Sequence, residues 1–271
     1  MFFTELKKKK ILISLIFIFF ITGCVGKIKE RIQEKPIATY VEKPAELIQQ
    51  DANRYLLQKN YVKAAASFEE VDKQHPYSKL AKKSKVMAAY AYYMGRDYKS
   101  SIFAIDRFIT LHPADKQLMP YALYLKGLCY FDRINNPALD QDPAENTKKI
   151  YQELIKKFPK SIYSKDAKKK ILIANDQLAA KEMTVGRYYQ QRNRHLAAIE
   201  RFKIVINDYN TTAQTPEALY RLTESYLSLG IIEEAKKTTA VLSYNFKESN
   251  WYKLSYNLFK KYGYKKNGKK G

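Results

Sequence analysis

The segment AAASFEEVDKQHP, residues 64–76, contains a pattern that returns along the chain and decides the fold. A small residue is followed four positions later by a large one and seven positions later by an apolar one. In the first three copies, a proline stands twelve positions after the small residue. Five copies, the last two weaker, begin at Ala64, Ser101, Thr147, Ala198 and Ala235. Self-similarity of this kind is the sequence signature of a repeat fold.

A second motif precedes each copy and consists of a small residue followed three positions later by tyrosine. Tyrosine accounts for 23 of 271 residues, so composition alone does not explain five tyrosines at one repeat position. From residue 45 onward, apolar residues recur at spacings of three and four, which indicates helices rather than strands. The motif occurs at Ala52/Tyr55, Ala89/Tyr92, Gly127/Tyr130, Gly186/Tyr189 and Thr223/Tyr226.

Together the two motifs predict a pair of helices, A and B, in each repeat. The pair would cross closely where the small residues meet, as in tetratricopeptide (TPR) repeats, and the larger side chains would fill the space on either side. We therefore predict an all-α fold, a right-handed solenoid of five TPR-like helix pairs over residues 44–262. The N-terminal repeats would span 44–160 and the C-terminal repeats 161–262.

Two insertions and a final helix complete the predicted array. Residues 132–144 would lengthen the loop of the third repeat, where Asp142, Pro143 and Glu145 resemble an N-cap, a first-turn proline and a capping glutamate. Helix A of the fourth repeat would be long, about 165–191.

A capping helix at about 250–262 would seal the last repeat with one apolar face. We expect that face to carry Trp251, Leu254 and Leu258.

The N-terminus has the three parts of a secretion signal. Four lysines, residues 7–10, precede an apolar run at 11–21 that is too short to cross about 30 Å of hydrocarbon. Gly23 and then Cys24 follow, which resembles the lipobox of bacterial lipoproteins. We predict that residues 1–23 are a lipoprotein signal peptide and that Cys24 is lipidated. The alternative is an uncleaved anchor with an incidental cysteine.

The parts outside the repeats are polar or basic. Residues 24–43 would form the lipidated cysteine and a flexible tether, and residues 263–271 a basic tail. The net charge of +22 would suit an acidic partner or anionic lipid, but an exported protein without a nucleic-acid motif argues against nucleic acid. Cys129 would be the only cysteine besides Cys24, so no internal disulfide is expected in the mature chain, and Cys129 is interpreted as a buried core residue.

The sequence contains none of the motifs that carry catalysis or cofactor binding. There is no glycine-rich phosphate loop and no His-Glu-x-x-His metal motif. His75 and His112 share one repeat position before the proline, so we interpret them as C-terminal helix residues where a cation suits the helix dipole. We predict no enzyme activity, no cofactor and no metal site.

Without a catalytic motif, the function is expected to lie in a binding surface. The inner faces of the A helices would form a concave groove. Aromatic side chains there offer a large contact area for a peptide at low entropic cost. For each of them, packing between repeats is an equal alternative, which stays open. The candidate groove positions are Asn53, Leu56, Tyr90, Tyr93, Tyr121, Tyr124 and Phe131.

The chain resembles the BamD family, lipoproteins of the outer-membrane β-barrel assembly machinery. The resemblance covers nearly all of residues 24–262, and it does not extend to the tail. It is most specific in the segments AKEMTVGRYY (180–189), AAIERF (197–202) and EALYRL (217–222), with HPYS (75–78) in the first repeat.

The resemblance implies a non-catalytic lipoprotein subunit that helps deliver and insert unfolded outer-membrane proteins. It implies a lipid-anchored location at the periplasmic face of the outer membrane. The implied partners are the periplasmic domains of the barrel-forming assembly protein, other assembly lipoproteins and unfolded substrates with an extended, aromatic-rich C-terminal signal. It also suggests a docking face, for which the candidates are Arg187, Arg192, Arg194 and His195.

Two other functions remain as alternatives. One is a TPR lipoprotein adaptor for peptidoglycan or envelope division. The other is an enzyme that uses the array as a scaffold for a wall-cleaving domain, although no segment outside the repeats is long enough to be that domain.

Overall fold

The computed structural model describes residues 42–262. The predicted signal peptide, Cys24, almost all of the tether and the basic tail lie outside the described residues. Among the helices of the described part, none is both long and apolar enough to cross a membrane.

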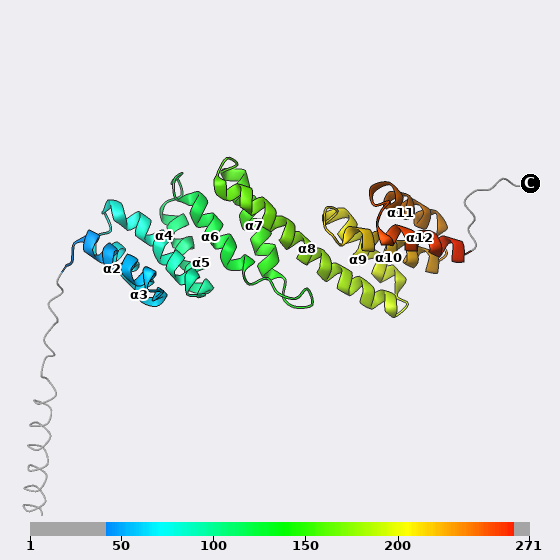
Figure 1. Cartoon of the computed structure of the whole chain (residues 1–271), viewed down its shortest axis with the longest axis horizontal. Coiled ribbons are helices and arrows are strands. Elements are labelled where there is room, and N and C mark those ends of the chain that lie inside the picture. Colours follow the sequence, from blue (N-terminus) through cyan, green and yellow to red (C-terminus); the bar gives the residue numbers. More distant parts are fainter. Residues whose placement is uncertain (1–41, 263–271) are drawn as a thin grey trace, which may run out of the picture. The chain divides into compact units, whose positions relative to one another are not determined.

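Residues 42–262 form helices joined by short connections and contain no strand (Figure 1). Five consecutive pairs, α2/α3 to α10/α11, are the A and B helices of the predicted repeats, and α12 follows as a cap. Helices that are adjacent in sequence pack on one another along the array. The predicted fold class is therefore confirmed. The helices are α2 (Ala45–Leu57), α3 (Tyr61–Gln74), α4 (Lys79–Met94), α5 (Tyr98–Leu111), α6 (Met119–Phe131), α7 (Asp142–Lys157), α8 (Ile162–Gln191), α9 (His195–Asp208), α10 (Thr215–Ser228), α11 (Ile232–Asn245) and α12 (Asn250–Lys261).

The small residues of the two motifs lie where helices A and B cross. Gly127 of α6 faces the ring of Tyr151 from α7, and Gly186 of α8 faces the ring of Phe202 from α9. In the second repeat, Ser101 Oγ donates a hydrogen bond of 2.8 Å to the carbonyl oxygen of Ala89. The spacing in the sequence thus reports a real steric fit between a small residue on one helix and a large one on the other.

In every repeat except the third, the tyrosine of the A-helix motif also takes part in ending its helix. The residue after the turn donates its backbone N–H to the tyrosine carbonyl, as Asn60 does to Tyr55 and Asp97 to Tyr92, both at 2.9 Å. This is the bond of a Schellman motif, which needs a left-handed residue just before the donor. The left-handed residues are Lys59 (φ 57°), Arg96 (φ 61°), Asn193 (φ 58°) and Gly230 (φ 73°).

Two of the following A helices, α4 and α8, start in the same way, whereas α6 and α10 have no capping side chain. Ser78 and Ser161 accept hydrogen bonds from the backbone N–H groups of Leu80 and Tyr163, so they cap α4 and α8. His75 and His112 are C-cap residues of α3 and α5, as predicted. Because Ser161 caps α8, this helix begins at Ile162, three residues before the predicted start.

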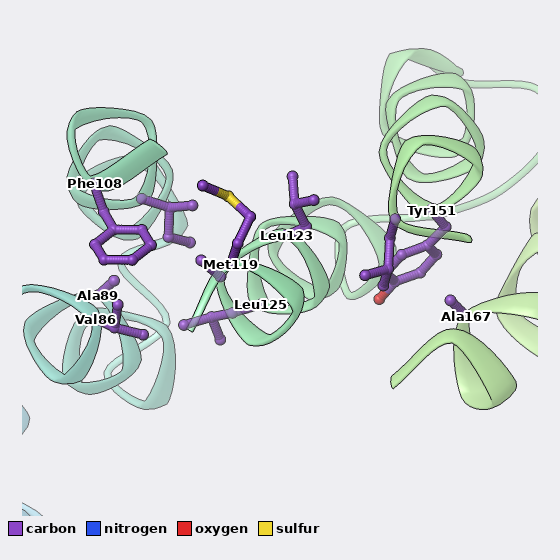
Figure 2. Close-up of a cluster of buried hydrophobic side chains, with 11 residues drawn as sticks. Val86, Ala89, Phe108, Met119, Leu123, Leu125, Tyr151 and Ala167 are labelled. Carbon is purple, nitrogen blue, oxygen red and sulfur yellow. The ribbon is translucent and has the colours of Figure 1, made fainter. Parts of the chain in front are cut away.

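The long helix α8 joins two hydrophobic clusters. Near its N-terminal end, Ala167 packs in a cluster with side chains of α4, α5, α6 and α7 (Figure 2). Further along, Ala179 and Met183 belong to a second cluster with α9, α10 and α11. Between them, Asp176 accepts a hydrogen bond of 3.0 Å from the backbone of Ala213. The second half of α8 therefore serves as helix A of the fourth repeat, and the first half completes the core of the third.

Two details of the prediction are wrong. Asp142 is the first residue of α7 and not its N-cap, and the cap residue Gln141 makes no capping side-chain bond. Asp140 instead accepts the N–H of Asp142 at 3.0 Å, two residues before the expected capping box.

In α12, Leu254 is exposed, whereas Ser255 is fully buried. The packed face follows Trp251, Ser255 and Leu258, because these positions lie on one side of the helix while Leu254 lies away from it.

The surroundings of His112 bear on the charge predicted for this residue. Burial, followed by repulsion from Lys85 and Lys82, lowers the pKa of this imidazole, and Asp115 and Asp72 oppose the shift only in part. The imidazole also packs against the ring of Phe108, with 5.2 Å between ring centres and 45° between the ring planes. Burial and the two lysines thus disfavour the cationic form that the sequence predicts at this helix end.

Candidate functional site

Four predicted groove tyrosines lie together on two neighbouring A helices. Tyr90 and Tyr93 of α4, with Tyr121 and Tyr124 of α6, are half-buried and pack on the cluster shown in Figure 2. Tyr163 of α8, which the prediction did not include, joins them. Its ring centre is 5.4 Å from that of Tyr121 and 5.2 Å from that of Tyr124. We call these five residues the tyrosine face.

Two hydroxyls of the tyrosine face connect successive repeats. Tyr93 donates a hydrogen bond of 2.7 Å to Asp132 at the end of α6, and Tyr124 donates one of 2.6 Å to Asp166 of α8. Burial, reinforced by these carboxylates, raises the pKa of both phenols well above the ordinary value of 10. Both side chains thus remain protonated donors, and each ties a helix A to the next repeat.

The other two predicted tyrosines differ in this respect. Within residues 42–262, the hydroxyls of Tyr90 and Tyr121 make no hydrogen bond, although their rings pack on the same core. Burial raises the pKa of Tyr121, and the neighbouring Tyr90 adds to the shift. Two phenol donors with apolar rings around them can bind the carbonyl groups and side chains of an extended peptide.

The remaining groove candidates are not part of the tyrosine face. Asn53 is exposed on α2, which packs on α3 and α4 but not on α6. Leu56 packs in the core of the first repeat. Phe131, at the end of α6, has the ammonium group of Lys170 4.3 Å from its ring centre. The structure thus brings the four tyrosines together and leaves Asn53 apart from them, while Phe131 is linked to Tyr124 through Lys170, which also lies 3.6 Å from Asp166.

The four docking candidates surround the junction of α8 and α9. Arg187 forms an ion pair of 3.2 Å with Glu217 of α10, so its charge is used inside the array. The guanidinium of Arg192 lies 3.6 Å from the ring centre of the exposed Tyr188.

The other two docking candidates, Arg194 and His195, lie at the start of α9. Arg194 is an exposed N-cap residue of α9, and the buried Nδ1 of His195 has no hydrogen-bond partner.

The described residues offer no evident centre for chemistry. No three His, Cys, Asp or Glu side chains of residues 42–262 are grouped so that they could hold a metal ion. The thiol of Cys129 is buried, and burial raises its pKa to about 11, so it is not a reactive thiolate. The described residues thus define a helical-repeat protein that carries a face of five packed tyrosines.

Comparison with known proteins agrees with this class and gives the family. The model of the YfiO family, described as outer membrane lipoprotein, matches residues 41–242. The chain belongs to this family of outer membrane lipoproteins.

Two relatives carry the name "Outer membrane protein assembly factor BamD". The relative from Caulobacter vibrioides is 43% identical over 238 residues, which cover 88% of this chain and 76% of the relative. The relative from Rickettsia prowazekii is 38% identical over 258 residues, which cover 95% of this chain and 99% of the relative.

Proposed function

We propose that the chain is a lipoprotein subunit of the machinery that assembles β-barrel proteins in the outer membrane. The name shared by its relatives and the description of its family support this role. In this proposal, Cys24 carries the lipid and residues 24–43 tether the array to the periplasmic face of the outer membrane. Several acyl chains would hold it stably, since each buried methylene contributes about 0.8 kcal/mol.

The role proposed for the array is binding and not catalysis. Its part in assembly is to receive unfolded outer-membrane proteins and to hold them beside the protein that inserts them. The observation that carries this proposal is the tyrosine face, where Tyr93 and Tyr124 fix the repeats and Tyr90 and Tyr121 keep unused hydroxyls. An extended, aromatic-rich peptide could stack on these rings and accept hydrogen bonds from the hydroxyls. Asn53 is retained only as an outlying contact of such a peptide, and Phe131 as a contact at the C-terminal end of α6.

The C-terminal repeats would dock on the periplasmic domains of the barrel-forming assembly protein, and other assembly lipoproteins would bind the same complex. Arg192 and Arg194 are the stronger docking candidates because both are exposed. Arg187 would act by keeping α8 and α10 together through Glu217. Exposed charges at the rim of an interface mainly set association rate and specificity, so we expect these arginines to select an acidic surface on the partner.

Affinity purification of the full-length, lipidated protein from cell envelopes tests this role. We expect the barrel-forming assembly protein to co-purify, and we expect mass spectrometry to find the lipid on Cys24. A Cys24→Ala variant should lose the lipid and the outer-membrane fractionation. Recovery of peptidoglycan enzymes without any barrel-assembly component would contradict the proposal.

A further inference from the structure

A recess open to solvent lies between the turn that joins α4 to α5 and the C-terminal end of α6. Its volume is about 480 Å³. Three of the side chains that line it are cations, namely Arg96, Lys99 and Arg133. Within residues 42–262, none of the three forms an ion pair with a carboxylate, although such pairs are frequent elsewhere in the array. We call this site the basic recess.

Asp97, the acidic residue that lines the basic recess, is hydrogen-bonded to the start of a helix. Asp97 is the N-cap of α5, and its side chain accepts a hydrogen bond of 3.1 Å from the backbone N–H of Ser100. Hydrogen bonding to Ser100 lowers the pKa of this carboxyl, so it stays ionised but remains directed to the helix end. Three cations against one anion leave the recess with a net charge of +2.

The rest of the wall is apolar and aromatic. It is formed by Tyr98 and Ile102 of α5 and by Tyr130 of α6, with the guanidinium of Arg133 5.9 Å from the centre of the Tyr130 ring. The ring centre of Tyr98 is 6.0 Å from that of Tyr93. The basic recess is therefore continuous with the tyrosine face through this pair of rings.

Arg96 occupies the left-handed position of the turn that joins α4 to α5. Arg96 has φ 61°, a left-handed conformation that only glycine adopts freely, and Gly230 occupies the corresponding position of the fifth repeat. Lys59 is its counterpart in the first repeat, with φ 57°, and it does not line the recess. This gives the recess a matched control residue with the same backbone and the same charge.

We propose that the basic recess binds a carboxylate of an extended peptide, with an apolar or aromatic side chain of that peptide against Tyr98, Ile102 and Tyr130. This proposal rests on the proposed function, because the tyrosine face would hold the neighbouring part of the same peptide. Guanidinium groups pair with carboxylates through two parallel hydrogen bonds, and a cavity of this size accommodates a ligand the size of one or two side chains. An isolated phosphate would match the charge but would leave the aromatic wall without a contact.

The test uses the full-length protein and three labelled peptides of one aromatic sequence. One has an internal Glu and an amidated C-terminus, one has Gln in its place, and one has Gln with a free C-terminal carboxylate. Fluorescence anisotropy should show at least one acidic peptide binding about tenfold more tightly than the neutral one. The two acidic peptides distinguish a side-chain carboxylate from a chain terminus. We expect the double variant Arg96→Gly/Arg133→Gln to lose this preference and Lys59→Gly to keep it.

Three outcomes would overturn the proposal. The first is equal binding of acidic and neutral peptides to the unmodified protein. The second is an acid preference that survives in the double variant or disappears equally in Lys59→Gly. The third is displacement of the acidic peptide by inorganic phosphate but not by acetate. Failure of the recess leaves binding of the neutral peptide intact, whereas failure of the proposed peptide role abolishes binding of all three peptides.

Discussion

Gly127 and Tyr151 face each other where α6 crosses α7. A methyl group added at Gly127 would lie 2.7 Å from Cδ1 of Tyr151 and closer still to two further ring atoms. The Tyr151 side chain is fully buried, so its ring has no free space into which it could move. The small residue of the helix A motif thus lies directly against the large residue of the helix B motif.

Gly127→Ala should therefore lower the free energy of unfolding by about 1 to 3 kcal/mol, despite the higher helix propensity of alanine. Urea denaturation followed by circular dichroism measures this value. In a Tyr151→Leu background the same change should cost less, because the atoms that it meets are gone. Equal costs in both backgrounds would show that the ring is not the obstacle.

Gly230 tests a different property of glycine. Apart from Gly230 itself and its two chain neighbours, no heavy atom lies within 4 Å of a methyl group built there, but φ is 73°. Gly230→Ala should cost about 1 kcal/mol through the backbone alone. Lys59→Gly should change stability in the opposite direction, since it removes a left-handed lysine from the equivalent turn. Thermal denaturation of both variants checks the pair, and a stabilising Gly230→Ala would refute the account of the turn.

A buried ion pair ties α3 to α4. Asp72 and Lys85 form it with side chains only 9% and 13% exposed, and the more exposed Arg107 is 3.6 Å from the same carboxylate. Asp72→Asn should cost about 3 to 5 kcal/mol, because it leaves Lys85 buried without a counter-charge.

Asp106→Asn is the control for this prediction. Asp106 also pairs with a lysine, Lys126, but its carboxylate is 49% exposed, so its removal should cost at most about 1 kcal/mol. Denaturant titration of both variants compares them. Similar costs for the two would mean that burial of the Asp72 pair has no effect on stability.

His112 should make stability depend on pH. Its pKa in the folded protein lies below the ordinary value of 6.5, first because of burial and then because of Lys85 and Lys82. The unfolded chain therefore binds a proton more readily than the folded one. Stability should be constant above about pH 6.5 and fall as the pH drops through 6.5 towards the folded pKa.

Denaturation curves over this pH range, measured for the unmodified protein and for His112→Gln, isolate this effect. The variant should have the flatter profile between about pH 6.5 and 5. Asp115, whose pKa is also lowered, titrates at more acidic pH and is common to both proteins. Parallel profiles would contradict the role given to His112.

The sequence predicts the helix pairs because their contacts are local and strict. Gly127 and Gly186 lie opposite Tyr151 and Phe202, and both pairs occupy the same two positions of the repeat motifs, although 24 residues separate the first pair and 16 the second. The sequence does not predict which side of α12 is buried, and Leu254 is the example. This short helix has several apolar residues, and only the helix that it packs on determines which of them are buried. The cap of α7 was misplaced because Asp140 and Asp142 both suit an N-cap by type.

The tyrosine face was predicted only in part for a related reason. Position in the repeat places Tyr90, Tyr93, Tyr121 and Tyr124 on one side of their helices. It does not give the partners Asp132 and Asp166, which come from the following repeats and decide which hydroxyls are used. Tyr163 was missed because it lies in the first turns of α8, before the part predicted to be helix A of the fourth repeat.

The central claim is that the tyrosine face binds the extended C-terminal segment of an unfolded barrel protein. The most direct measurement is the affinity of such a peptide for the unmodified protein and for Tyr90→Ala/Tyr121→Ala. Tyr244→Ala, at a side chain that is 89% exposed on α11, is the matched control. We predict about tenfold weaker binding for the double variant, as expected for the loss of two aromatic contacts, and no change for the control. Unchanged affinity in a double variant with an intact helical circular dichroism spectrum would contradict the claim.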